Sequence, residues 1–127
     1  MSMEINRPEV LREVSAAFAR YEAALVGNDT ATLDALFWHA DAVVRYGAGE
    51  NLVGIEAIRA FRAARPSTGL ARTLANTVIT TFGSDFATTM TEYHREGVPR
   101  VGRQSQTWVR FDEGWRVVAA HVSLIAS

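Results

Sequence analysis

The first quarter of the chain repeats apolar residues at intervals of three or four positions. They fall on one face of an α-helix of about 18 residues, and they are Val10, Val14, Phe18, Tyr21 and Leu25. Pro8 suits the first turn of this helix, and the pair Gly27-Asn28 is typical of its end. Because Tyr21 lies within the apolar stripe, its ring belongs in a core, while its hydroxyl requires a polar partner.

Two shorter helices are predicted next. Asp29 and Thr30 cap the second helix, whose apolar side consists of Leu33, Leu36 and Phe37. The third helix opens at Gly54 and stops at Pro66, and its inward residues are Ile55, Ile58 and Phe61. The same pattern assigns three arginines largely to other faces of this helix: Arg59, Arg62 and Arg65.

The remaining segments have the composition of β-strands. Asp41–Tyr46 and Asn51–Val53 are predicted to pair across the turn Gly47-Ala48-Gly49. Longer strands follow, separated by short turns: Ala71–Phe82, Phe86–Arg95, Arg100–Phe111 and Trp115–Ile125. Long strands joined by short turns form an antiparallel meander.

Helices followed by a meander define an α+β fold, and residues 1–127 are predicted to form one domain. The long strands must curl to cover three helices, which produces a cone with one open end. We therefore expect three N-terminal helices packed in a curved, mixed and mainly antiparallel sheet. The concave open end is the expected ligand site.

The composition is that of an ordinary globular domain, with 48% apolar residues, 21% charged residues and a net charge of −1. It favours neither nucleic acid nor a membrane as a partner. No signal peptide is recognisable, so the cytoplasm is the expected location. Cysteine is absent and all 13 basic residues are arginine, which excludes thiolate chemistry and a lysine Schiff base. The histidines lack metal-binding spacing, so neither a metal nor a cofactor is expected.

The stretch Phe37–Gly54 contains the most unusual chemistry. Arg45 ends an apolar strand beside a glycine turn, which suits a carboxylate clamp if its side chain points inward. Strand alternation puts Arg45 on the face of Val43, and Tyr46 on the face of Val44. If Val44 faces the interior, Tyr46 is the pocket residue and Arg45 points outward. The competing interpretation is a surface arginine paired with Glu50 or Glu92.

Other polar and aromatic residues are candidates for substrate contacts. Trp38 and His39 adjoin at the end of the second helix, and a histidine can carry a proton near neutral pH. Arg72 and Arg103 are candidates for a second carboxylate contact. Two residues of the last strand suit either the pocket or a dimer surface: His121 and Ser123. One face of the third long strand predicts an oligomer surface: Gln104, Gln106 and Trp108.

Four runs carry a resemblance to a known family: RYGAGENLVGIEAIRAFRAARP, VITTFGSDFAT, GRQSQTWVRF and GWRVVAAHVSL. They resemble the AtzH-like family, which includes HpxZ-type proteins, within the NTF2-like (SnoaL-like) superfamily. The resemblance implies a decarboxylase of cyanuric acid or oxalurate catabolism that converts 1,3-dicarboxyurea to allophanate beside a partner amidase. It also implies a homodimer or higher homo-oligomer, and it carries a functional pair over to Tyr21, in ARYEAAL, and Arg45, in VVRYGAGEN.

Ketosteroid isomerase is similar in its cone and in the position of Tyr21, which matches that enzyme's oxyanion-binding tyrosine. Its catalytic base falls on Tyr46 and its second acid on Thr107, so steroid enolisation is not expected. A non-catalytic module that binds a small anion, or that supports an amidase, is the alternative function.

Overall fold

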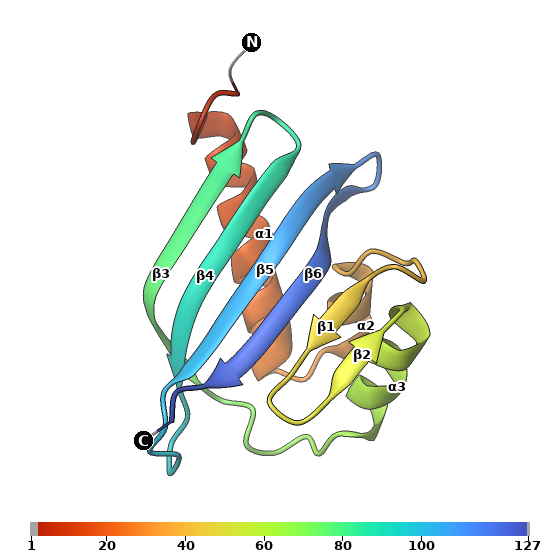
Figure 1. Ribbon diagram of the computed structural model, residues 1–127, viewed down its shortest axis with the longest axis vertical. Helices are drawn as coiled ribbons and strands as arrows, with labels where there is room; N and C mark the ends of the chain where they lie inside the picture. The colour runs from red at the N-terminus through yellow and green to blue at the C-terminus, as the bar shows by residue number, and fades with distance from the viewer. Residues whose placement is uncertain (1–2, 127) are drawn as a thin grey trace.

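The computed structural model describes residues 3–126 as helices packed on a six-stranded sheet (Figure 1). The helices are α1 (Pro8–Val26), α2 (Thr30–Ala35) and α3 (Ile55–Ala64). The strands are β1 (Val44–Tyr46), β2 (Asn51–Val53), β3 (Thr73–Phe82), β4 (Phe86–His94), β5 (Gly102–Phe111) and β6 (Gly114–Leu124). The predicted α+β class and element order are confirmed.

The strand order in the sheet is β2-β1-β6-β5-β4-β3. Strands β3 to β6 form the predicted antiparallel meander, whereas β1 pairs with β6 in parallel. The pairing register shifts between Ala75 and Val78 and again between Thr107 and Trp108, and such irregularities bend a sheet. In Figure 1, α1 lies behind the long strands, and α2 and α3 lie around β1 and β2, so the helices cover one face of the sheet.

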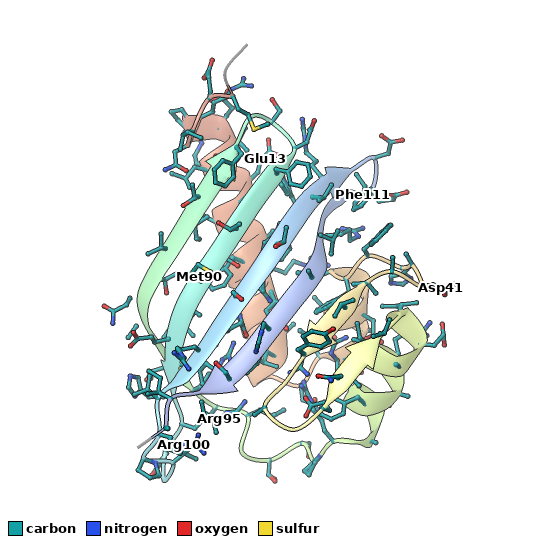
Figure 2. All side chains as sticks on the ribbon, in the orientation of Figure 1. Glu13, Asp41, Met90, Arg95, Arg100 and Phe111 are labelled. Carbon is teal, nitrogen blue, oxygen red and sulfur yellow. The ribbon has the colours of Figure 1, made fainter. Side chains whose placement is uncertain are left out.

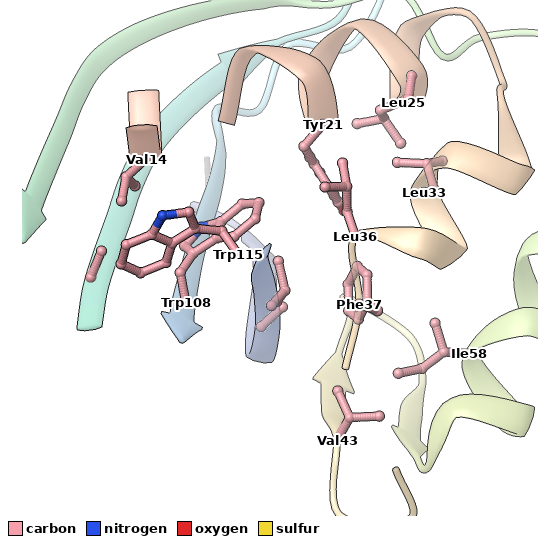
Figure 3. Packing of buried hydrophobic residues seen from close by; sticks show 14 of the residues in the cluster. Val14, Tyr21, Leu25, Leu33, Leu36, Phe37, Val43, Ile58, Trp108 and Trp115 are labelled. Atoms are coloured by element: carbon pink, nitrogen blue, oxygen red, sulfur yellow. The ribbon is translucent and has the colours of Figure 1, made fainter. Parts of the chain in front are cut away.

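The core forms where the helices meet the inner face of the long strands (Figure 3). Trp108 and Phe37 are its largest fully buried side chains, and Val14 of α1 and Val117 of β6 pack in the same cluster. The indole nitrogen of Trp108 donates to Thr89 Oγ1 at 3.1 Å. This bond satisfies the one polar atom of the Trp108 side chain, so the ring can be buried completely.

The polar face of β5 points in the direction opposite to the predicted one. Gln104 and Gln106 are 4% and 2% exposed, on the same inner face as Trp108. The prediction that they form an oligomer surface is therefore wrong. The amide oxygen of Gln106 accepts a hydrogen bond from Thr89 at 3.0 Å, whereas its buried amide nitrogen has no partner among residues 3–126.

The prediction that Arg62 points away from the interior is also wrong. Arg62 follows Ile58 by one helical turn, so both residues lie on the inner face of α3. The guanidinium forms an ion pair with Asp34 and stacks over the Phe37 ring at 4.7 Å. Pairing and stacking together make a 4% exposed arginine tolerable.

No helix within residues 3–126 is long and apolar enough to cross a membrane.

Candidate functional site

Arg45 points toward the helices. It lies opposite Ala120 of β6 and Leu52 of β2, both of which contact the core. Val43, two residues earlier, is fully buried, so Val43 and not Val44 faces the interior. Tyr46 consequently faces outward, is 42% exposed and contacts the His121 ring edge-on at 6.1 Å. The open question of orientation is thus settled in favour of Arg45.

The turn Gly47–Glu50, which follows β1, positions the Arg45 side chain. Arg45 Nη1 donates to Glu50 Oε1 at 2.9 Å, and its guanidinium lies 5.5 Å from the centre of the Phe61 ring. A Cβ atom on Gly47 would collide with the Glu50 carboxylate, so only glycine leaves room for this contact. The predicted partner Glu50 is correct, but the pair is largely buried, with 16% of the Arg45 side chain exposed.

Tyr21 lies on α1 between the core and the polar part of the interior. Its ring contacts Phe37 at 6.1 Å and meets the edge of Trp108 at 6.4 Å, and the residue is 4% exposed. Within residues 3–126 its hydroxyl forms no hydrogen bond to another side chain or to the backbone. The hydroxyl is therefore free to donate to a ligand.

Several positive charges converge on Arg65. Burial is the main cause that lowers the pKa of Arg65, and the nearby charge of Arg62 lowers it further. Tyr21 acts in the opposite sense, and Arg45 and Arg95 contribute smaller lowering effects. Because these influences require proximity, the five side chains lie in one region, where Arg65 and Arg95 are half-buried. We call this region, together with Arg72, the arginine end.

Arg72 forms a wall of the arginine end. Its guanidinium donates to both oxygens of Glu22, at 2.8 and 2.6 Å, and to Gln104 Oε1 at 3.0 Å. It also lies 4.5 Å from the centre of the Tyr93 ring, and its side chain is 2% exposed. With its charge matched by Glu22, Arg72 is better suited to support the site than to bind a ligand carboxylate.

Other candidates lie elsewhere. Trp38 stacks on Phe111 at 5.8 Å, and the two rings line a cavity of about 480 Å³ that also contacts His39. Phe111 and Arg95 occupy opposite ends of the sheet (Figure 2). Arg103 is exposed on the outer face, in a groove of about 380 Å³ with His121 and Ser123. Tyr21 is not among the residues that line this cavity or this groove, although its ring contacts Phe37, which lines the cavity of Trp38 and His39.

The sequence analysis did not consider Arg95 as a site residue, and it assigned Arg65 to another face of the third helix. Arg95 follows Tyr93 by two positions, and strand alternation was sufficient to place both on one face. Arg65 ends α3 with an extended backbone, φ −75° and ψ 151°, because Pro66 disfavours the helical conformation in the residue before it. Its φ is still helical, and its spacing from Ile58 and Arg62 puts it on the same inner face of α3. Among residues 3–126, no group of three histidine, aspartate or glutamate side chains is placed to hold a metal ion.

Comparison with known proteins gives a consistent family and fold. A structure of a protein of unknown function from Pectobacterium atrosepticum SCRI1043, of the DUF3225 family, is 64% identical with a TM-score of 0.95, over 96% of this chain and 95% of that one. A cystatin-like fold protein from Burkholderia xenovorans LB400 is 51% identical with a TM-score of 0.94, over 98% of each chain.

A more distant structure shows the fold alone. An NTF2-like protein of unknown function from Pseudomonas putida KT2440 is 19% identical with a TM-score of 0.77, over 95% of this chain and 90% of that one. No curated protein matches the sequence. The AtzH-like family profile matches residues 3–127. The chain therefore belongs to the AtzH-like family and has the NTF2-like fold.

Proposed function

We propose that this protein is a cofactor-independent decarboxylase that removes CO₂ from an N-carboxylated urea, of the type that converts 1,3-dicarboxyurea to allophanate. The observation that carries the proposal is the excess of positive charge at the arginine end. Arg45, Arg62 and Arg72 each pair with one carboxylate, from Glu50, Asp34 and Glu22. Within residues 3–126, Arg65 and Arg95 have no carboxylate partner, and a substrate with two negative charges would balance them.

The reaction breaks the bond between a urea nitrogen and its carboxyl carbon. The bonding electron pair stays on the nitrogen and delocalises into the adjacent urea carbonyl, CO₂ departs, and the nitrogen then gains one proton. Negative charge therefore moves from the leaving carboxylate to the urea oxygen and nitrogen. A group that donates a hydrogen bond to the urea oxygen stabilises the transition state more than the bound substrate.

Tyr21 and Arg45 have different roles in this reaction. In the proposal, the Tyr21 hydroxyl donates to the urea oxygen as charge develops there, and supplies or relays the proton. Arg45 orients the leaving carboxylate. Glu50 shares the charge of Arg45, so the leaving carboxylate is held without the full strength of an isolated cation. That restraint is useful because this carboxylate loses its charge in the reaction.

The test compares two variants with matched controls. Tyr21→Phe and Arg45→Ala should lower the rate of CO₂ release from 1,3-dicarboxyurea by roughly 10²- to 10³-fold, with far-ultraviolet circular dichroism unchanged. Tyr46→Phe and Arg103→Ala remove the same groups from the outer face of the sheet and should leave the rate unchanged. Normal CO₂ release by both Tyr21→Phe and Arg45→Ala would contradict the proposal.

The same experiment separates the enzyme from the alternative module. If the wild-type protein releases CO₂ no faster than the uncatalysed reaction, yet binds a dicarboxylate or co-purifies with an amidase, the accessory role is supported instead. The paired state of Arg45, with Glu50 2.9 Å away, is the feature most compatible with that alternative.

A further inference from the structure

Two arginines at the arginine end have buried nitrogen atoms without hydrogen-bond partners among residues 3–126. These atoms are Arg65 Nε and Arg95 Nε, and the buried amide nitrogen of Gln104 is in the same state. Two more buried atoms without a partner in the described chain, Thr81 Oγ1 and Gln106 Nε2, lie outside the arginine end. Buried donors are usually bonded, so unpartnered ones in one region indicate a group that binds there. Gln104 Oε1 is already occupied by Arg72, which leaves the amide nitrogen as its available donor.

The end of β4 positions Arg95. Tyr93 and Arg95 are two positions apart, so both side chains lie on the inner side of the sheet. The Arg95 guanidinium lies 5.2 Å from the centre of the Tyr93 ring. Tyr93 lies opposite Gly102 of β5, where a Cβ atom would collide with the ring. The ring thus lies across the neighbouring strand and supports Arg95 without neutralising its charge. Arg95 lines a cavity of about 400 Å³ together with Arg72.

The end of α3 positions Arg65. Its φ of −75° is helical, so its side chain stays on the face of Ile58 and Arg62, and its Nη2 lies 3.5 Å from Asn28 Oδ1. Asn28 is neutral, so this contact at the limit of hydrogen-bond length leaves the positive charge of Arg65 uncompensated. Arg65 is therefore available to pair with an anion.

We propose that Arg65 and Arg95, assisted by the Gln104 amide, form a subsite for a second carboxylate, the one that the substrate keeps. The inference rests on the proposed function and deepens it, because it defines the ligand as a dianion and assigns its two ends. The leaving carboxylate lies with Arg45, whose charge is shared with Glu50. The kept carboxylate has the same charge before and after CO₂ departs, so strong pairing there does not oppose the reaction.

This assignment replaces the earlier candidates for the second carboxylate contact. Arg72 is saturated by Glu22 and Gln104, and Arg103 lies on the outer face. Neither has an available guanidinium in the interior. The pair Arg65 and Arg95 has both the position and the uncompensated charge.

The test is calorimetric binding of glutarate and butyrate. Glutarate has three atoms between its carboxylate carbons, as 1,3-dicarboxyurea does, and butyrate presents a single carboxylate. The wild-type protein should bind glutarate more tightly than butyrate. Arg95→Gln and Arg65→Gln should each weaken glutarate binding by roughly tenfold or more while changing butyrate binding less than about twofold. Arg103→Gln removes the same charge from the outer face and should change neither affinity.

Turnover gives an independent readout. Binding of the kept carboxylate is equally strong in substrate and transition state, so Arg95→Gln should raise KM for 1,3-dicarboxyurea with little change in kcat. Arg45→Ala should lower kcat. A structural role for Arg95 would instead lower the melting temperature, whereas removal of an uncompensated charge should leave it unchanged or raise it.

Three outcomes would overturn the subsite. Equal loss of glutarate and butyrate binding in folded Arg95→Gln and Arg65→Gln would indicate one undivided anion site. Unchanged glutarate binding in both variants would exclude these arginines. Wild-type protein that binds glutarate no more tightly than butyrate has no second subsite, although a monoanion site at Arg45 and the decarboxylase proposal would stand. Binding of neither ligand, together with no CO₂ release, would overturn both proposals.

Discussion

The inner face of the sheet has two ends with opposite chemistry. At one, which we call the aromatic end, Trp108 (Figure 3) and Val117 are completely buried. Phe37 is also completely buried and lies between the two ends, because the Arg62 guanidinium stacks on its ring. At the arginine end, guanidinium groups outnumber the carboxylates that contact them. Tyr21 lies between the two ends. Its ring contacts Phe37 and Trp108, and its proximity to Arg65 acts to raise the pKa of that arginine. One face of one sheet thus provides both the stabilising core and the candidate site.

The two ends differ in how many of their buried polar atoms lack a hydrogen-bond partner, and each such atom lowers the stability of the fold. At the aromatic end the indole nitrogen of Trp108 donates to Thr89, and the buried Gln106 Nε2 is the unpartnered nitrogen next to this pair in the described chain. The arginine end leaves buried nitrogens of Arg65 and Arg95 without partners in the described chain. Such an arrangement costs stability until an anion binds, and it is typical of a site organised in advance for its ligand.

The largest expected effect on stability comes from the aromatic end. Trp108→Ala should lower the free energy of unfolding by about 3–5 kcal/mol, because it removes a completely buried ring and leaves a cavity. Urea denaturation measures this change. Val78→Ala removes an apolar side chain that is 57% exposed on the outer face, and it should change stability by less than about 0.5 kcal/mol. Similar losses in the two variants would mean that the aromatic end is not the core.

A smaller loss is expected at the wall of the arginine end. Arg72→Met leaves the Glu22 carboxylate without its partner, and breaking a buried pair costs about 3–5 kcal/mol. We expect about 3 kcal/mol, since 16% of the Glu22 side chain remains in contact with solvent. The double variant Glu22→Gln with Arg72→Met should recover part of this loss, because no unpaired charge remains.

Ligand binding by the single variant Arg72→Met checks the sharper claim that Arg72 supports the site and does not bind the ligand. Arg72→Met should reduce the affinities for glutarate and butyrate by the same factor, if at all. Selective loss of glutarate binding, of the kind expected for Arg95→Gln, would place Arg72 in the subsite. Arg72 would then be a ligand contact and not only a supporting residue of the arginine end.

The regular elements were predictable from the sequence because their spacing is long and repeated. The stripe from Val10 to Leu25 defines α1, and the alternating strands define the meander. The face of Arg45 was not predictable, because β1 has only three residues, too few for alternation to fix its register. The decisive fact is the complete burial of Val43, which precedes the strand.

Polar residues of the interior were harder to predict than apolar ones. Gln104 and Gln106 share the face of Trp108, and this spacing already indicated the interior, but their polarity favoured a surface. Their burial depends on partners from distant parts of the chain, Arg72 for Gln104 and Thr89 for Gln106. Sequence spacing contains no information about such pairs. For the same reason, Arg65 and Arg95 became candidates only once their neighbours were known.

The smallest expected effect concerns the turn between α1 and α2, which provides Asn28, the contact of Arg65. Hydrogen bonds from the Thr32 hydroxyl, at 2.6 Å, and from the Thr32 backbone, at 3.1 Å, lower the pKa of Asp29. A carboxyl group with a lowered pKa stabilises the fold above its ordinary range and loses that contribution as the pH falls through the lowered value. Asp29→Ala should therefore reduce the melting temperature slightly at pH 7, with the difference from wild type closing in acid.

Thermal melting between pH 7 and pH 3 measures this difference, with Asp41→Ala as the control, because Asp41 is an exposed aspartate that caps no helix. If the turn also sets the position of Arg65, Asp29→Ala should weaken glutarate binding at pH 7 more than butyrate binding. Unchanged binding of both ligands would show that Arg65 depends on Pro66 and the end of α3, and that the α1–α2 turn contributes to stability alone.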